Sequence, residues 1–182
     1  PVEQVFTSPQ HPYTRDLLAA EPKPDPAPPR PEAPVVMSTD DLKVWFPIKR
    51  GLLRKTIGHV KAVDGVSLKV RQGETLGVVG ESGSGKTTLG LALLRLISSQ
   101  GPIVFLSKDI QGLQFKDMRP IRRDMQIVFQ DPFGALSPRM SVGDIIAEGM
   151  SVHQPSLSAE DREARVVKGL QDVGIDPKTR FR

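Results

Sequence analysis

The sequence has no cysteine and few aromatic residues, with one Trp, one Tyr and seven Phe among 182 residues. The lack of cysteine excludes disulfides, thiolate zinc sites, cysteine-held iron–sulfur clusters and a cysteine nucleophile within these residues. No run approaches the roughly 20 apolar residues that a membrane-spanning helix needs. Residues 1–15 do not show the basic and then apolar pattern of a signal peptide. A starting Met is also missing, so we expect the sequence to begin within a longer polypeptide.

The remaining composition is that of an ordinary globular protein. Charged residues make up 25% and hydrophobic residues 38%, and the length suits one domain with some additional chain. The net charge of +4 fits a polyanionic ligand, nucleic acid or an acidic membrane face, but it does not require any of them.

A proline-rich stretch divides the chain. Residues 21–34, EPKPDPAPPRPEAP, contain seven prolines. Proline fixes φ and lacks an amide hydrogen, so this stretch can neither pair within a sheet nor continue a helix. We interpret it as an extended spacer that could reach roughly 43 Å at about 3.1 Å per residue. The spacer separates residues 1–20 from a unit formed by residues 35–182.

Hydrophobic patterning after the spacer predicts strands and helices in an α/β layered domain. Pro47 is expected to end the first strand, and residues 49–61 to form a basic hairpin or loop. A buried helix is expected from Lys86 to near Ser98. Ser141 and Ser158 are predicted to cap the N-termini of helices at about 142–152 and 159–173. The predicted strands are 44–46, 66–70, 75–79, 103–106 and 125–129.

The stretch GESGSGKTT at residues 80–88 carries the strongest chemical signal. It fits Gly-x-x-x-x-Gly-Lys-[Ser/Thr], with an apolar segment before it and a helix-forming run after it, as a phosphate-binding loop requires. Glycines let the backbone bend and bring its N–H groups to phosphate oxygens, and the following helix points its positive end at the same anion. The residues expected to hold the nucleotide are Gly80, Ser82, Gly83, Ser84, Gly85, Lys86, Thr87 and Thr88.

The side chains after the loop have separate expected roles. Lys86 would bridge the terminal phosphates of a nucleoside triphosphate, Thr87 would bind Mg²⁺, and Thr88 could hydrogen-bond an inner phosphate. The loop alone predicts a nucleoside triphosphate as ligand. It does not separate transport ATPases, small GTPases, nucleoside kinases and DNA-repair ATPases.

A second motif narrows the class of nucleotide-binding protein. Residues 128–140 read VFQDPFGALSPRM, and together with residues 80–88 they resemble the ATP-binding cassette family. The first part, VFQDP, is similar to the family's Q-loop. The longer string is similar to the version in dipeptide and oligopeptide importers, although Ala135 and Ser137 stand where those commonly have Ser and Asn. This resemblance implies a P-loop cassette whose helical subdomain begins at about residue 141.

Residues 1–18, with the run His-Pro-Tyr-Thr at 11–14, resemble the C-terminal end of a peptide-importer ATPase. The order therefore resembles a tandem-fused ATPase: the tail of one cassette, a linker at 21–34, and the beginning of a second cassette at 35–182. Before this resemblance is considered, residues 1–20 could equally be a disordered tail. Three further stretches, at 42–51, 90–101 and 152–163, are similar to the fused ATPases of peptide importers that also admit microcin C.

The resemblance implies further site residues. Phe46 aligns with an aromatic residue that stacks on adenine, and Trp45 is its neighbour; both rings could instead pack in a sheet. Gln130 is expected to approach Mg²⁺ and the attacking water, so the implied catalytic residues are Lys86 and Gln130 and the implied metal ligands are Thr87 and Gln130. Residues 49–55 are expected to form a solvated hairpin, with contact to the nucleotide or to an acidic surface as the alternative.

Other parts of the family pattern do not occur in this sequence. It has no Leu-Ser-Gly-Gly-Gln signature, no strand ending in Asp-Glu and no switch histidine. We therefore expect a fragment that binds ATP but does not hydrolyse it alone. The implied whole protein would hydrolyse ATP to energise peptide import, as a peripheral subunit on the cytoplasmic face of the inner membrane. Its implied partners are a second cassette on the same polypeptide, permease subunits and, indirectly, a periplasmic peptide-binding protein.

Two other functions stay open. One is a non-transport cassette ATPase of DNA repair or translation, although the importer-like motifs lead us to expect no nucleic-acid partner. The other is a regulatory half that binds nucleotide without cleaving it, which an intact phosphate-binding loop alone does not exclude.

Overall fold

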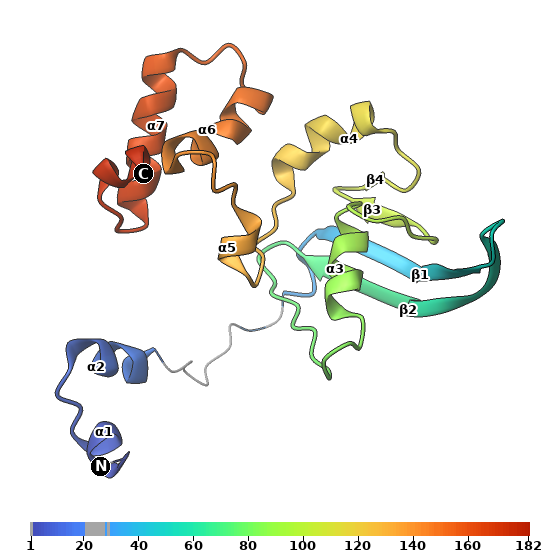
Figure 1. Ribbon diagram of the computed structural model, residues 1–182, viewed down its shortest axis with the longest axis horizontal. Helices are drawn as coiled ribbons and strands as arrows, with labels where there is room; N and C mark the ends of the chain where they lie inside the picture. Colours follow the sequence, from blue (N-terminus) through green and yellow to red (C-terminus); the bar gives the residue numbers. More distant parts are fainter. Residues whose placement is uncertain (1, 21–27, 29) are drawn as a thin grey trace.

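The computed structural model describes residues 2–20, 28 and 30–182, where a four-stranded antiparallel sheet packs against short helices (Figure 1). The order of strands across the sheet is β2-β1-β3-β4. Most of the predicted spacer at 21–34 lies outside the described residues. The strands are β1 (Val35–Arg50), β2 (Lys55–Arg71), β3 (Ile103–Phe105) and β4 (Lys108–Asp109).

The helices are short, and most of them follow the sheet in the sequence. They are α1 (Val2–Thr7), α2 (Pro12–Ala19), α3 (Lys86–Leu93), α4 (Phe115–Ile121), α5 (Pro132–Ala135), α6 (Val142–His153) and α7 (Ala159–Asp172), with 3₁₀ turns η1 (Arg122–Asp124) and η2 (Pro177–Phe181). None of the described helices combines the length and apolar character needed to cross a membrane.

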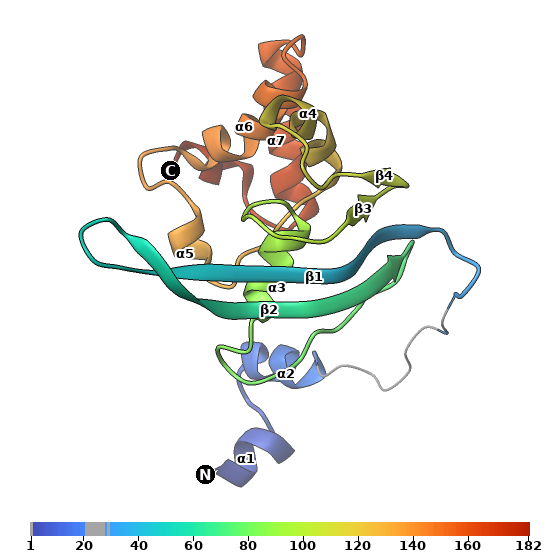
Figure 2. The same ribbon diagram turned by 90° about the vertical axis from the view of Figure 1, so that its right-hand side faces the viewer.

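The longest strands are β1 and β2, which form a hairpin that extends across most of the width of Figure 2. Its turn at 51–54 is closed by a hydrogen bond from the amide of Arg54 to the carbonyl of Gly51, at 3.0 Å. This confirms the hairpin predicted within 49–61. The prediction that Pro47 ends the strand is wrong. Pro47 pairs with His59 of β2. The strand β3 pairs with β1 only at Met37–Thr39, so among the described residues β1 has no second neighbouring strand at Pro47. The amide hydrogen that proline lacks is therefore not needed for a hydrogen bond there.

The hydrophobic core lies between the sheet and the helices α3 and α4. Leu42 and Val44 of β1 and Ile103 of β3 are fully or almost fully buried, and Ala92 of α3 packs with them. The remaining core side chains are Val63, Leu89, Phe105, Ile110 and Met118. The core therefore holds β1 at its centre, flanked by β2 and β3, and it fixes α3 against the sheet.

Two predicted strands do not form, and these predictions were wrong. Residues 75–79 and 125–129 have no regular structure. Val79 is 93% exposed and Val128 is 96% exposed, so the apolar side chains that suggested strands are not covered. A strand requires a neighbour that accepts and donates backbone hydrogen bonds, and neither segment pairs with a strand in the described part of the chain.

Helix α3 starts at Lys86 as predicted but ends at Leu93, before the expected Ser98. Arg95 adopts a left-handed conformation, with φ of 55°, which ends the helix. Its guanidinium donates hydrogen bonds to the carbonyls of Ile110 and Leu113. These contacts tie the end of α3 to the loop after β4.

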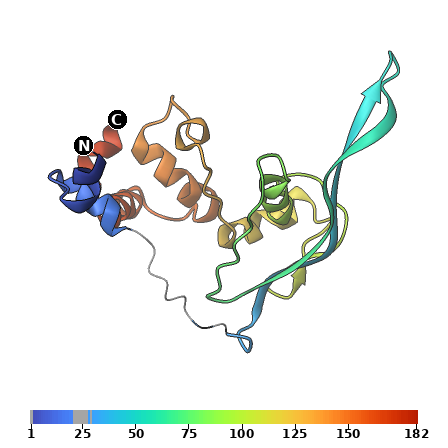
Figure 3. The same ribbon diagram turned by 90° about the horizontal axis from the view of Figure 1, so that it is seen from below.

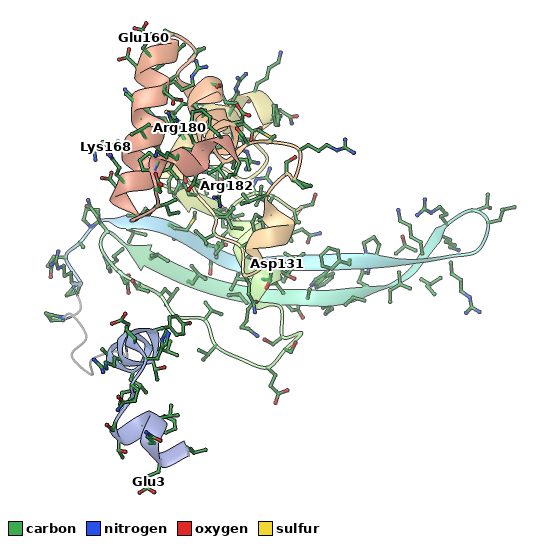
Figure 4. The ribbon with its side chains drawn as sticks, turned by 60° about the vertical axis from the view of Figure 1, so that its left-hand side comes forward. Glu3, Asp131, Glu160, Lys168, Arg180 and Arg182 are labelled. Carbon is green, nitrogen blue, oxygen red and sulfur yellow. The ribbon has the colours of Figure 1, made fainter. Side chains whose placement is uncertain are left out.

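Local capping predictions at α6 and α7 are confirmed. The Ser141 hydroxyl accepts from the amide of Asp144 at 3.1 Å, and the Ser158 hydroxyl accepts from the amide of Asp161 at 3.0 Å. In α6 the carboxylate of Asp144 also accepts from the backbone of Ser141, which completes a capping box. The two helices pack together with η2, which carries Arg180 (Figure 4). The Arg180 guanidinium pairs with the Glu163 carboxylate.

Replacing Ile103 by Ala should lower the free energy of unfolding by about 2–5 kcal/mol, because it leaves a cavity beneath the centre of the sheet. Urea denaturation followed by Trp fluorescence measures the change. The matched control is Leu106→Ala, one residue beyond the same strand, where the side chain is exposed and the loss should stay near 0.5 kcal/mol. Equal losses in the two variants would contradict the placement of the core.

Candidate functional site

The candidate site is the loop at 80–85 together with the first turn of α3. Residues 80–84 are exposed, and the loop passes from the end of the hairpin region into the helix (Figure 1). Gly85 is the N-cap residue of α3, with φ of 92°. A Cβ atom at Gly85 would lie 2.1 Å from the carbonyl oxygen of Ala62 in β2, so only glycine fits between the loop and the sheet.

The ammonium of Lys86 lies over the loop that precedes it. Its Nζ donates to the carbonyl of Gly80 at 2.8 Å and to the carbonyl of Glu81 at 2.6 Å. The Ser84 hydroxyl is also within reach, at 3.4 Å. The loop therefore holds the ammonium of Lys86 at its bend, next to the start of α3.

The start of α3 provides donors for an anion. The first N–H groups of a helix have no acceptor within it, and Gly85 supplies no side-chain cap. The first intrahelical bond runs from the amide of Leu89 to the carbonyl of Gly85. Thr87, which is exposed, and Thr88, which is half-buried, add hydroxyl groups to the same turn. These donors, together with Lys86, fit a phosphate group, since the helix end also carries a partial positive charge.

The same residues fit a magnesium ion that is shared with a phosphate ligand. Magnesium prefers oxygen ligands and commonly keeps water molecules in addition to one or two protein groups and phosphate oxygens. Thr87 offers one hydroxyl oxygen at the start of α3. The described residues contain no group of three or more His, Cys, Asp or Glu side chains that could hold a metal by themselves.

Phe46 and Trp45 lie on the hairpin close to the residue that touches the loop. Phe46 pairs with Val60 and Trp45 with Lys61, the residue before Ala62. The indole of Trp45 donates to the carboxylate of Asp64 at 2.9 Å. The ammonium of Lys61 lies 4.3 Å from the centre of the Trp45 ring. Phe46 is 46% exposed.

Gln130 lies in an exposed, irregular segment rather than at the end of a strand. No hydrogen bond of the described residues joins its side chain to the loop at 80–88. Asp131, labelled in Figure 4, follows it immediately before α5. The Asp131 carboxylate accepts from the amide of Gly134 at 3.2 Å. The structure thus brings the Lys86 loop and the β1–β2 hairpin together, but it does not join Gln130 to them.

Sequence reasoning missed the contribution of Ala62. Its carbonyl, not its side chain, sets the position of Gly85, and a backbone contact between distant segments leaves no residue-type pattern. The only indirect signal was the glycine itself, since its conformation and lack of a side chain permit the close approach.

Comparison with known proteins defines the class. The family model described as ABC transporter matches residues 63–181, which include the loop, α3 and the helices up to η2. The chain therefore belongs to the ABC transporter family.

Among curated relatives, the chain is 62% identical over 181 residues to the peptidoglycan transport ATP-binding protein YejF of Agrobacterium fabrum (strain C58). It is 41% identical over 208 aligned residues to the glutathione import ATP-binding protein GsiA of Escherichia coli (strain K12). Both alignments cover 100% of this chain but only 33% of the relative, so the chain spans about a third of their length.

Solved structures support the fold. The ATP-binding cassette MJ0796, in a post-hydrolysis dimer bound to ADP and Pi, matches 80% of this chain and 60% of its own with a TM-score of 0.66 and 20% identity. The cbiO1 protein of Clostridium perfringens matches 81% of this chain and 53% of its own with a TM-score of 0.60 and 23% identity. The α/β cassette fold expected from the sequence is confirmed.

Gly85→Ala should destabilise the chain more than Gly83→Ala. Both glycines have positive φ, so each alanine carries a backbone cost of about 1–2 kcal/mol, but only the one at 85 meets the Ala62 carbonyl. We expect an additional loss of about 1–3 kcal/mol for Gly85→Ala from this overlap. Urea unfolding of the two variants measures the difference, and a loss at position 83 as large as at 85 would contradict the loop geometry.

Proposed function

We propose that the loop at 80–88 binds ATP with Mg²⁺, and that the whole protein is an ATPase subunit that energises import of peptides. The observation that carries the nucleotide proposal is the placement of Lys86 and the unpaired amides of α3 around one bend. The transport proposal is supported by the family and by relatives whose names refer to peptidoglycan transport and glutathione import. Both names refer to compounds that contain peptide bonds.

The residues of the loop have distinct proposed roles. The backbone of Gly80, Ser82, Gly83, Ser84 and Gly85 would surround the phosphates, and Lys86 would exchange its two carbonyl partners for phosphate oxygens. Thr87 would bind Mg²⁺, and Thr88 would donate to an inner phosphate. When bound, Mg²⁺ neutralises charge on the phosphates and orients them. The role of the protein is to hold one ammonium and several amides where that charge is greatest.

Phe46 is the proposed partner of the adenine ring. It lies on β1 opposite Val60 of β2, and Val60 is two residues before Ala62. Its ring is partly exposed and offers a face for stacking.

Gln130 is the proposed group that approaches the metal and the attacking water. This role requires the irregular segment at 125–131 to move toward the loop.

The proposed organisation follows the order of the sequence. Residues 1–20 would be the tail of a preceding cassette, residues 21–34 a linker, and residues 35–182 the first part of a second cassette. The helices from about residue 141 would contact membrane permease subunits. Such a protein would lie on the cytoplasmic face of the inner membrane and depend on a periplasmic peptide-binding protein for cargo.

Lys86→Ala should weaken binding of a fluorescent ATP analogue by at least tenfold, because a hydrogen bond to a charged group contributes about 1.5–3 kcal/mol. The control is Lys108→Ala, which removes an exposed lysine from β4 and should leave the affinity unchanged. Titration with and without Mg²⁺ measures both variants. Binding by Lys86→Ala at the affinity of the unchanged chain would contradict the loop assignment.

The 182-residue chain should bind ATP and release phosphate at a negligible rate. Hydrolysis needs a group that accepts the proton of the attacking water, and the family's acidic pair does not occur in this sequence. A coupled phosphate assay with Mg²⁺ measures the rate, and the Lys86→Ala variant gives the background. Sustained phosphate release above that background would show that other groups suffice.

A further inference from the structure

The end of the β1–β2 hairpin, residues 48–57, reads IKRGLLRKTI and is here called the hairpin tip. Figure 3 shows it projecting away from the helices and from the rest of the sheet. The strand β3 pairs with β1 only at Met37–Thr39, so beyond Trp45 the hairpin is a ribbon of two strands. A two-stranded ribbon is only marginally stable in water by itself, so contact with an external partner would stabilise this end of the hairpin.

The turn of the tip exposes two aliphatic side chains. Leu52 is 100% exposed and Leu53 is 93% exposed. Ile48 and Ile57 flank them on the two strands and are also exposed. Single exposed aliphatic residues are ordinary, but here four of them gather on ten residues at the furthest point of the hairpin.

The tip also carries four positively charged side chains. Lys49, Arg50, Arg54 and Lys55 are exposed, and the sequence contains no Asp or Glu between Asp41 and Asp64. None of the four forms an ion pair with any residue that the structure describes. The tip is thus a cluster of four positive charges, unpaired in the described part of the chain, with no acidic residue near it in the sequence.

We propose that the hairpin tip docks on the surface of a bilayer that contains anionic lipids. Leu52 and Leu53 would enter the boundary between headgroups and acyl chains, and the four cations would lie among the anionic headgroups. Basic residues that flank aliphatic side chains match such an interface, where the long stems of Lys and Arg also contact apolar surface. The proposal rests on neither nucleotide binding nor peptide transport.

The observations favour lipid over nucleic acid. Residues 47–58 contain no Phe, Tyr or Trp that could stack on bases. Phosphate contacts would use the four cations but would leave Leu52 and Leu53 exposed to water. A bilayer uses both kinds of side chain, and the narrow end of a hairpin can reach it without moving the sheet.

Sedimentation with lipid vesicles tests the proposal on the 182-residue chain. We expect binding to vesicles of equal parts phosphatidylglycerol and phosphatidylcholine that is at least tenfold stronger than binding to pure phosphatidylcholine. Lys49→Gln with Lys55→Gln should weaken it by about 25-fold, since each cation near an anionic surface contributes about fivefold. The matched control, Lys108→Gln with Lys116→Gln, changes the net charge equally from exposed positions on β4 and α4 and should bind like the unchanged chain.

The aliphatic contribution has its own variant and control. Leu52→Ser with Leu53→Ser should weaken vesicle binding by about tenfold. Leu106→Ser with Leu136→Ser removes two exposed leucines elsewhere and should have no effect. These controls also account for nonspecific adhesion by the exposed apolar residues near the loop.

Direct insertion can be observed because the chain has no cysteine. Leu53→Cys, labelled with an environment-sensitive dye, should shift its emission to the blue on anionic vesicles, whereas Leu106→Cys should not. Equal binding to both vesicle types, undiminished binding by the two tip variants, or equal emission shifts at both cysteines would overturn the proposal. Capture of single-stranded nucleic acid by the tip in place of vesicles would also overturn it. Binding of the ATP analogue by the tip variants should match that of the unchanged chain, so the outcome is independent of the loop.

Discussion

The close approach of Gly85 to the carbonyl of Ala62 is the contact on which the position of the site depends. It is the point where the loop before α3 rests directly on the sheet. The register of the hairpin changes here, since Val44 pairs with Val63 but Trp45 pairs with Lys61, which leaves Ala62 as an extra residue. Such a bulge bends a strand and disturbs its pairing. The site is therefore anchored by an irregularity in the backbone, and any side chain at position 85 would push the loop away from β2.

The features that sequence analysis predicted correctly are those that short segments determine. Serine caps at 141 and 158 are set by residues three positions further along, and the start of α3 at Lys86 is set by the glycine before it. The hairpin within 49–61 follows from its turn. In each case the hydrogen bonds that define the feature join residues close in sequence, so the pattern alone contains the information.

The incorrect predictions concern segments whose structure depends on distant partners. The runs at 75–79 and 125–129 are apolar, but they lack paired neighbours in the described residues, and Val79 and Val128 face water. An apolar run indicates that burying the segment would be favourable. It does not show whether a neighbouring strand is present to pair with the segment and cover its side chains. Pro47 was predicted to end a strand but lies within one. It can do so because β1 has no second neighbouring strand at this position in the part of the chain that the structure describes.

Trp45 and Phe46 are adjacent, but their contacts differ, and so does the access of a planar ligand to each ring. Trp45 already has partners, because its indole N–H is bonded to Asp64 and the ammonium of Lys61 covers one face of its ring. A base that stacked on that face would have to displace a cation–π contact. Phe46 has no polar group that needs a partner, and much of its ring is exposed. The family resemblance had already favoured Phe46 over Trp45, and the contacts of Trp45 give a physical reason for the same choice.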